Sequence, residues 1–170
     1  MIERFYPCEM RDSAYEVEYE EFYEKGYRGI LFDIDNTLVG HGAEADERAT
    51  ALVKRLKETG YRICFVSNNK EPRVKSFCDA LDAPYVYKAG KPKGDGYSKG
   101  LELLSLPKEQ VLAIGDQIFT ATWGANRAGI TSILVGQLEK KEEIQIILKR
   151  RLEYFVKKSY QRRQGRKKHE

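Results

Sequence analysis

Two aspartates, Asp33 and Asp35, are separated by a single residue at the end of a short apolar run. Residues two apart on an extended backbone point to the same side, so both carboxylates could act on one substrate. A carboxylate that closes a buried strand must be hydrated, paired or bound to a cation, because burying it alone is costly. The alternative interpretation of this D-x-D pattern is a pair of solvated turn residues.

Two more segments end in polar residues that could join this pair. Ser67 follows the apolar run 61–66, and Asp116 comes soon after the run 111–114. In an open parallel sheet, ligands bind beyond the carboxyl ends of the strands, so we expect the three segments to meet at one edge. Carboxylate oxygens without histidine or thiolate partners favour Mg²⁺ over zinc or copper.

The elements that would position these residues alternate between strand and helix patterns. The expected strands are 29–34, 61–66, 85–87, 111–114 and 132–135, and the expected helices are 11–25, 47–59, 71–81, one that ends at 101–106, and 120–128. Such alternation predicts an α/β fold, a three-layer Rossmann-like parallel sheet covered on both sides.

Length and composition exclude several other classes of protein. A chain of 170 residues suits one domain, and 41% hydrophobic with 33% charged residues argues against general disorder and against a membrane-spanning segment. The first ten residues hold no secretory hydrophobic core, so a cytoplasmic location is expected. Cys8, Cys64 and Cys78 have no C-x-x-C spacing and are expected to be reduced packing residues.

Positive charge gathers at the C-terminal end. Residues 138–170 hold 12 basic and 5 acidic residues in a chain whose net charge is +4. The rest of the chain therefore offers no basic field to attract a polyanion. We expect a single domain over 1–156 and a basic, mobile tail over 157–170.

Helical spacing near this basic end predicts an amphipathic helix. Its apolar side would comprise Ile144, Ile147, Leu148, Leu152, Phe155 and Val156, opposite Lys149, Arg150, Lys157 and Lys158. Packing of the apolar side on the core is the favoured interpretation. Peripheral contact with an anionic membrane, or with RNA through the tail, is the alternative.

The polar segments also carry four ordered motifs of a known family. Phe32–Val39 resembles motif I of the haloacid dehalogenase-like (HAD) phosphatases, and Val66–Asn69 resembles their motif II. Lys91–Pro92 resembles the lysine motif, and Ile114–Gln117 resembles motif IV. Within the superfamily the chain is most similar to the capless YqeG-like group of subfamily IIIA, over roughly residues 5–155.

The resemblance implies a phosphatase that works through a covalent intermediate. Asp33 would attack phosphorus to give an aspartyl-phosphate, and Asp35 would act first as an acid and then as a base. Thr37 would orient these two carboxylates. Its alternative role is that of a simple turn hydroxyl.

The resemblance also assigns the groups that bind the phosphorylated substrate. Ser67 and the main-chain amide of Asn68 would bind phosphoryl oxygens, and Lys91 would offset the charge of the transferring group. Lys91 is chosen because it precedes a proline as in the family motif. Lys88 and Lys93, close by in sequence, would be ordinary solvated lysines.

Three oxygen groups would complete the implied metal site, and one family group is missing. The side chains of Asp33 and Asp116 and the main-chain carbonyl of Asp35 would hold Mg²⁺ together with waters and phosphate.

A second acid usually follows the motif IV aspartate by four or five residues, where this chain has Thr120 and Ala121. Its loss is expected to weaken Mg²⁺ binding and lower activity. An impaired or altered variant is the alternative.

A short connection, Val39 to Asp46, leaves no room for a lid domain, so the site is expected to be open. Open sites suit bulky phosphoesters. YqeG-like proteins resemble enzymes that dephosphorylate phosphatidylglycerol phosphate, so a lipid head-group phosphate is one candidate substrate. Two alternatives are a weakened HAD fold used as a binding or scaffold protein, and an RNA- or ribosome-associated factor that acts through the basic tail.

Overall fold

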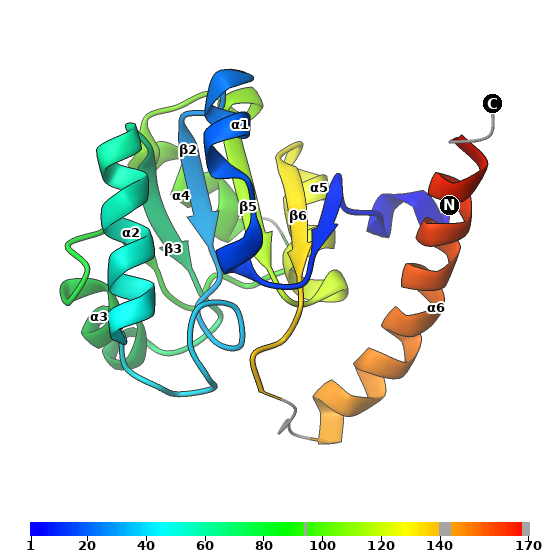
Figure 1. Ribbon diagram of the computed structural model, residues 1–170. Coiled ribbons are helices and arrows are strands. Elements are labelled where there is room, and N and C mark those ends of the chain that lie inside the picture. The colour runs from blue at the N-terminus through cyan, green and yellow to red at the C-terminus, as the bar shows by residue number, and fades with distance from the viewer. Residues whose placement is uncertain (94, 140–143, 168–170) are drawn as a thin grey trace.

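Six parallel strands form one sheet at the centre of the molecule (Figure 1). The computed structural model describes residues 1–93, 95–139 and 144–167. The strands are β1 (Glu9–Arg11), β2 (Gly29–Phe32), β3 (Arg62–Val66), β4 (Tyr85–Val86), β5 (Val111–Gly115) and β6 (Thr131–Val135). Their spatial order is β1-β6-β5-β2-β3-β4 and every pairing is parallel, which confirms the predicted fold class.

Helices alternate with these strands along the chain. They are α1 (Tyr19–Glu24), α2 (Glu47–Thr59), α3 (Glu71–Asp79), α4 (Asp95–Leu104), α5 (Trp123–Ala128) and α6 (Ile144–Lys167). Four shorter helical segments accompany them: η1 (Ile2–Phe5), η2 (Ala14–Glu16), η3 (Lys108–Gln110) and the π-helical turn η4 (Ile118–Thr122). Within the described residues, no helix has the length and apolar content needed to cross a membrane.

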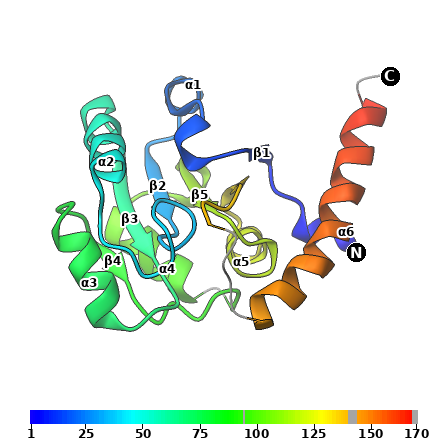
Figure 2. The ribbon, with the colours of Figure 1, turned by 60° about the horizontal axis from the view of Figure 1, so that its bottom comes forward.

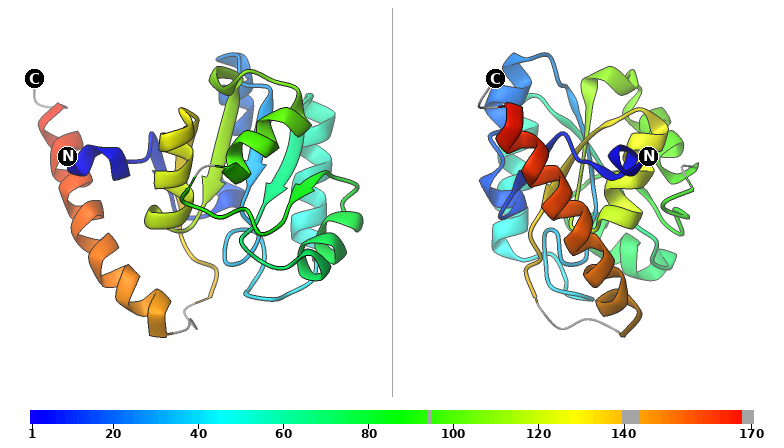
Figure 3. Two further views of the ribbon diagram at one scale, coloured as in Figure 1. Left: turned by 180° about the vertical axis from the view of Figure 1, so that it is seen from behind. Right: turned by 90° about the vertical axis from the view of Figure 1, so that its right-hand side faces the viewer.

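The two faces of the sheet bury two separate hydrophobic cores. Ile30 and Phe32 of β2 belong to a core shared with α1, α2 and α3, whereas Leu31 belongs to a core shared with α4 and α5. This alternation follows from the strand geometry, since successive side chains point to opposite faces. Figure 3 shows the sheet between α1 and α2 on one side and α4 and α5 on the other. The three layers thus match the expected architecture.

The N-terminal segment differs from its prediction. The single helix expected over 11–25 is replaced by β1, η2 and the six-residue helix α1. β1 is a three-residue edge strand whose register with β6 pairs Glu9 with Ile133. A strand of three residues is too short to show an alternating pattern in the sequence. Its hydrogen bonds come from pairing with β6 in the folded protein.

The cysteines are free thiols, and two of them are packing residues as expected. Cys64 and Cys78 are buried, and burial raises the pKa of each thiol to about 12, which keeps both in the unreactive protonated form. Cys8 is exposed, so the expectation of a packing role is wrong for this residue.

Helix α6 runs along the side of the molecule that also carries the N-terminus (Figure 1). Its inward residues are Arg150, Glu153, Val156 and Tyr160, spaced three or four apart. Val156 packs with Ile118 and Leu134, and Tyr160 donates a hydrogen bond to the carbonyl of Cys8 at 3.1 Å. The helix is therefore attached to η4, β6 and the N-terminal segment.

The helix turns a different side toward the sheet from the one predicted. Leu152 and Phe155, expected on the packed side, are 60% and 65% exposed, and Arg150, expected on the polar side, points inward. Only Val156 of the described apolar set is buried, and the side chains of Ile144, Ile147 and Leu148 lie outside the described residues. The side that faces the sheet edge instead carries the contact of Arg150 with Asp116.

The same helix crosses the expected boundary of the domain. It continues without interruption from Ile144 to Lys167, so the division between 1–156 and 157–170 falls inside it. Tyr6 and Ser159 share a hydrogen bond of 2.7 Å across this region. Residues 168–170 lie outside the described part of the chain, and a mobile tail stays a prediction.

The sheet reverses its chain order between β5 and β2. From β2 the chain moves outward through β3 to β4, and from β5 it moves the other way to β6. The carboxyl ends of β2, β3 and β5 lie at the lower edge in Figure 1 and turn toward the viewer in Figure 2. Such a reversal is where ligands bind in open α/β sheets.

Helix α2 leads away from this edge and carries both of its expected end signals. The Asp46 side chain accepts a hydrogen bond of 2.7 Å from the amide of Ala49, and Gly60 ends the helix in the left-handed conformation, with φ at 114°. A side chain at Gly60 would also collide with the hydroxyl of Tyr23.

Replacing Asp46 with alanine should lower the free energy of unfolding by about 1 kcal/mol, because the first turn of α2 loses its side-chain acceptor. Asp46→Asn retains an acceptor oxygen and should remain close to the wild type. Urea unfolding followed by circular dichroism measures both. Equal losses for the two variants would show that the cap is not the source of the effect.

Candidate active site

The two motif I aspartates lie in a tight turn immediately after β2. The amide of Asp33 extends the sheet by bonding the carbonyl of Ile114 at 2.9 Å, and the amides of Thr37 and Leu38 then turn back to the carbonyl of Ile34. Asn36 takes the left-handed conformation, with φ at 59°, which asparagine tolerates better than most residues. This turn keeps Asp33 and Asp35 at one pocket, although both lie beyond the strand itself.

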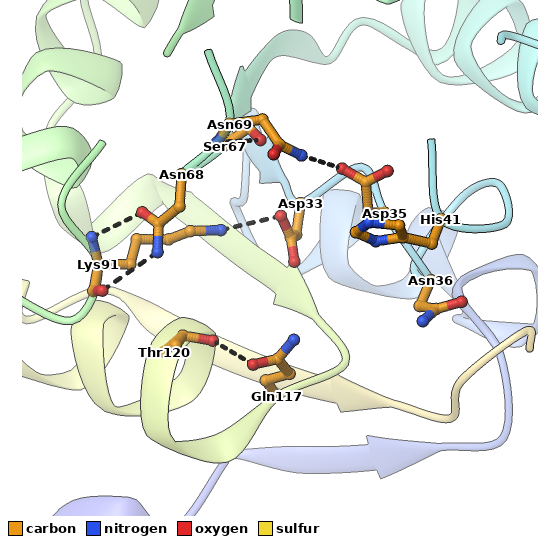
Figure 4. A pocket seen from close by; sticks show the side chains of 10 residues that line it. All are labelled: Asp33, Asp35, Asn36, His41, Ser67, Asn68, Asn69, Lys91, Gln117 and Thr120. Carbon is orange, nitrogen blue, oxygen red and sulfur yellow. Dashed lines mark hydrogen bonds and ion pairs between the residues drawn. The ribbon is translucent and has the colours of Figure 1, made fainter. Parts of the chain in front are cut away.

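The pocket at this edge has a volume of about 150 Å³. Figure 4 shows its lining: Asp33, Asp35, Asn36, His41, Ser67, Asn68, Asn69, Lys91, Gln117 and Thr120. Five of the seven predicted site residues are among them. The other two, Thr37 and Asp116, are completely buried behind the pocket.

Lys91 forms an ion pair with Asp33 inside this pocket. Its Nζ lies 2.9 Å from Asp33 Oδ1 and donates to the carbonyl of Val66 at 2.8 Å. The Lys91 side chain is only 3% exposed, whereas Lys88 and Lys93 are exposed. A buried ammonium needs a partner of opposite charge, and Asp33 supplies it. The structure thus separates Lys91 from its two neighbours in sequence.

Ser67 and Asn68 follow β3 and lie beside this ion pair. Ser67 continues the sheet through its amide, and its hydroxyl accepts a hydrogen bond from the amide of Asn69 at 3.1 Å. The Asn68 side chain bonds both the amide and the carbonyl of Lys91, at 2.9 and 3.2 Å. This side chain therefore holds the lysine segment, a role that the motif comparison did not assign.

Three donors hold the Asp35 carboxylate at the pocket. The amide of Gly42 donates to Oδ1 at 2.7 Å, Asn69 donates to Oδ2 at 2.6 Å, and Arg73 donates to Oδ1 at 3.1 Å. The sequence analysis did not assign roles to Asn69 or Arg73. Arg73 lies in the first turn of α3, where an arginine is ordinarily solvated, so only its closeness to motif II could have drawn attention to it.

Asp116 follows β5 and is buried beside Asp33. Burial raises the pKa of the Asp116 carboxyl and the negative charge of Asp33 raises it further, while Arg150 and Lys91 act in the opposite direction. Arg150 of α6 approaches Asp116 Oδ2 to 2.5 Å. Apolar spacing in this helix predicts Arg150 on the solvent side, so the contact does not follow from the sequence.

Thr37 has a different partner from the one expected. Its hydroxyl lies 3.4 Å from Asp116 Oδ1, a long hydrogen bond, rather than between Asp33 and Asp35. That Thr37 orients the carboxylates of Asp33 and Asp35 stays a prediction. The amide of Thr37 bonds the carbonyl of Ile34 in the turn after β2, while its hydroxyl meets the residue that follows β5.

The donor set fits a hard divalent cation. Within the described residues, no group of three or more histidine, cysteine or acidic side chains gathers as a metal cluster. The expected set needs only two carboxylates, those of Asp33 and Asp116, with a main-chain carbonyl. The hydrogen bond from the amide of Asp33 to the carbonyl of Ile114 places Asp33 beside the end of β5, which Asp116 follows, and oxygen donors of this kind suit Mg²⁺.

The positions of the missing second acid lie in η4. Thr120 lines the pocket, and its hydroxyl lies 3.2 Å from Gln117 Oε1. Ala121 is buried against Gly115, so closely that a Cβ on Gly115 would come within 2.4 Å of it. Neither side chain carries a charge.

Comparison with known proteins gives a family match and two similar phosphatases. Residues 42–129 match the model of a family described as haloacid dehalogenase-like hydrolase. The chain is 37% identical to the Bacillus subtilis protein called probable phosphatase YqeG. The alignment spans 137 residues, which are 79% of this chain and 80% of that protein. It is 28% identical over 150 residues to chloroplastic phosphatidylglycerophosphate phosphatase 1 of Chlamydomonas reinhardtii, over 82% of this chain and 56% of that protein.

A solved structure shares the fold. The cobalt-bound form of deoxy-D-mannose-octulosonate 8-phosphate phosphatase (YrbI) from Haemophilus influenzae aligns with a TM-score of 0.53 and 14% identity, over 65% of this chain and 69% of that one.

Because of the family match and the similarity to YqeG, the chain belongs to the haloacid dehalogenase-like hydrolases, and it is an enzyme of that class. Within the family, its similarity to the B. subtilis YqeG protein extends over about four fifths of both chains.

Replacing Lys91 with methionine should destabilise the protein more at neutral than at acidic pH. Lys91 lowers the pKa of Asp116, so without it that pKa lies further above its value in the unfolded chain. The folded state then binds more protons than the unfolded state and loses stability as the pH rises through this range. Urea unfolding at about pH 5 and about pH 8 measures the difference.

Lys93→Met is the matched control, because Lys93 is exposed two residues further along. It should show no additional loss at the higher pH. Equal destabilisation of Lys91→Met at both pH values would contradict the charge argument.

Proposed function

We propose that the chain is a Mg²⁺-dependent phosphomonoester hydrolase that acts through an aspartyl-phosphate on Asp33. One observation carries the proposal: the Asp33 carboxylate is paired with a buried ammonium, Lys91, in a pocket that Asp35 and Ser67 also line. An attacking carboxylate, a cation, a second carboxylate and a hydroxyl are the groups that transfer of a phosphoryl group requires. Family membership supports the same chemistry.

The reaction would proceed in two displacements. A carboxylate oxygen of Asp33 attacks phosphorus while the bond from phosphorus to the ester oxygen breaks, and Asp35 gives its proton to that leaving oxygen. Asp35 then takes a proton from the water that attacks the aspartyl-phosphate, which releases inorganic phosphate and restores Asp33. The three donors that hold Asp35 support this role, because the same carboxyl group must stay in place for both steps.

Lys91 and Ser67 would bind the phosphoryl oxygens. A lysine ammonium has three donors, of which Asp33 and Val66 take two in the structure, so the third can meet a phosphoryl oxygen. The Ser67 hydroxyl can donate while it continues to accept from the amide of Asn69. The Asn68 main-chain amide would add a further donor.

Asp33, Asp116 and the main-chain carbonyl of Asp35 would hold Mg²⁺. When bound, the ion supplies positive charge that stabilises the phosphoryl oxygens in the transition state. The H. influenzae neighbour is described as cobalt-bound, which supports a divalent metal in this fold.

Asp33→Asn should lower the rate of phosphate release from p-nitrophenyl phosphate by about 1,000-fold or more, because an amide cannot form the acyl phosphate. The wild-type activity should disappear with EDTA and return with excess Mg²⁺. Asp82→Asn, at an exposed turn after α3, is the control and should retain the wild-type rate. A wild-type chain that folds, binds phosphorylated compounds and releases no phosphate would favour the alternative of a scaffold protein.

We further propose a bulky or lipid-linked substrate that resembles phosphatidylglycerol phosphate. Residues 39–46 form only a short connection between the β2 turn and α2, so the pocket has no lid domain from this segment. The name of the Chlamydomonas relative points to a lipid phosphate. An open pocket can receive a phosphate that remains attached to a large body.

The outer side of α6 supports peripheral contact with an anionic membrane. Leu152, Tyr154 and Phe155 are 58–65% exposed, and Lys158 and Arg162 follow Phe155 at helical spacing, both exposed. Apolar and aromatic side chains beside basic ones are typical of helices that lie at a membrane surface. We name Leu152, Phe155, Lys158 and Arg162 the outer stripe of α6.

The chain should sediment with vesicles that contain phosphatidylglycerol and leave vesicles of pure phosphatidylcholine in suspension. Phe155→Ser should weaken binding several-fold, because it removes an apolar group from the outer stripe. Leu103→Ser is the matched control, since Leu103 is a half-exposed leucine on α4. Binding to RNA with a steep dependence on salt, together with indifference to vesicles, would instead favour the RNA-associated alternative.

A further inference from the structure

Two charged residues of α6 reach the site through a continuous set of contacts. Arg150 Nη1 donates to the carbonyl of Asp116 at 2.6 Å, and Nη2 donates to Asp116 Oδ2 at 2.5 Å. Glu153 Oε2 lies 3.1 Å from Arg150 Nη1. Glu153 Oε1 accepts from the amide of Ile118 at 2.8 Å and, more weakly, from that of Phe119 at 3.4 Å.

These contacts are buried, which distinguishes them from an ordinary surface ion pair. The side chains of Asp116 and Glu153 are 0% and 2% exposed, and that of Arg150 is 16% exposed. Charges removed from water at this depth persist only with good geometry and full hydrogen bonding. The planar guanidinium meets this need, because its fork binds the main chain and the side chain of Asp116 at once.

The contacts with Arg150 hold Asp116 through only one of its two carboxylate oxygens. Arg150 takes Oδ2, while Oδ1 has only the long contact with Thr37 among the described residues. Oδ1 therefore remains the oxygen that can serve a cation. Glu153 accepts from Nη1, the nitrogen that also donates to the Asp116 carbonyl, and its other oxygen accepts from the first amides of η4. The guanidinium is thereby tied to the segment after β5 both directly and through Glu153.

We propose that Arg150 and Glu153 are positioning residues that hold Asp116 in the orientation needed to bind Mg²⁺, an inference that rests on the proposed function. The segment η4 carries Thr120 and Ala121 where the family usually has a second acid, and it has no carboxylate of its own there. Glu153 brings a buried carboxylate to the start of the same segment from a different element. Helix α6 thus completes the active site rather than only covering the sheet.

The test is a titration of the full-length chain with MgCl₂ by isothermal titration calorimetry. The dissociation constant for Mg²⁺ should increase about 10-fold or more in Arg150→Met and in Glu153→Gln, as is usual when a group that orients a metal ligand is removed. The double variant should lose little more than either single variant, since both act through one network. Arg151→Met, an exposed arginine next in sequence, should bind Mg²⁺ like the wild type.

Three results would overturn the inference. Unchanged Mg²⁺ affinity with a lowered melting temperature would mean that α6 acts only on stability. Tighter Mg²⁺ binding by Arg150→Met would mean that the guanidinium competes with the metal instead of orienting its ligand. A wild-type chain that takes up no Mg²⁺ would remove the basis for it. If Arg150→Met fails to fold, Arg150→Lys carries the test, since it keeps the charge and loses the fork.

Phosphate release in the same samples separates this inference from the proposed function. A wild-type chain that hydrolyses p-nitrophenyl phosphate, with Arg150 variants that bind Mg²⁺ normally, leaves the proposed function in place and refutes the role of α6. A chain whose Mg²⁺ binding depends on Arg150 but that releases no phosphate supports the role of α6 and refutes the hydrolase.

Discussion

Negative charge at one edge of the sheet is the constraint on which the rest of the site depends. Asp33, Asp35 and Asp116 come together there, and like charges at short range in a poorly hydrated place repel strongly. Each carboxylate meets its own cation: Lys91 lies 2.9 Å from Asp33, Arg73 lies 3.1 Å from Asp35, and Arg150 lies 2.5 Å from Asp116. The three cations come from three different elements, so the edge is balanced only when all of them have packed.

This balance explains how a phosphate dianion can enter a site built from carboxylates. A phosphate monoester and a divalent cation carry opposite charges, so together they add little net charge to the edge. The three ion pairs hold the carboxylates in place. Preorganised groups of this kind avoid the cost of reorienting during the reaction.

Much of this arrangement could be predicted from the sequence, because it follows from strand ends. Asp33, Ser67 and Asp116 each come after a buried run, and parallel strands bring such positions together. Lys91 was distinguished from Lys88 and Lys93 only through the family motif, since nothing in their spacing separates them.

The cations that hold Asp35 and Asp116 could not be found in the same way. Arg73 and Arg150 lie on helices among other polar residues, and only the tertiary fold shows that each is turned toward a carboxylate. The orientation of α6 was misjudged for the same reason. Hydrophobic spacing favoured Leu152 and Phe155 as the inward side, whereas the structure turns Arg150 and Glu153 inward, toward Asp116 and η4.

The position of Arg150 along the chain has a consequence for how the protein is made. Arg150 lies 34 residues after Asp116. The strands of the sheet therefore leave the ribosome before the arginine whose guanidinium pairs with Asp116. Until α6 has docked, Asp116 lacks the guanidinium that pairs with it in the folded protein. The docking of α6 therefore sets the moment at which the nascent chain first has a balanced site.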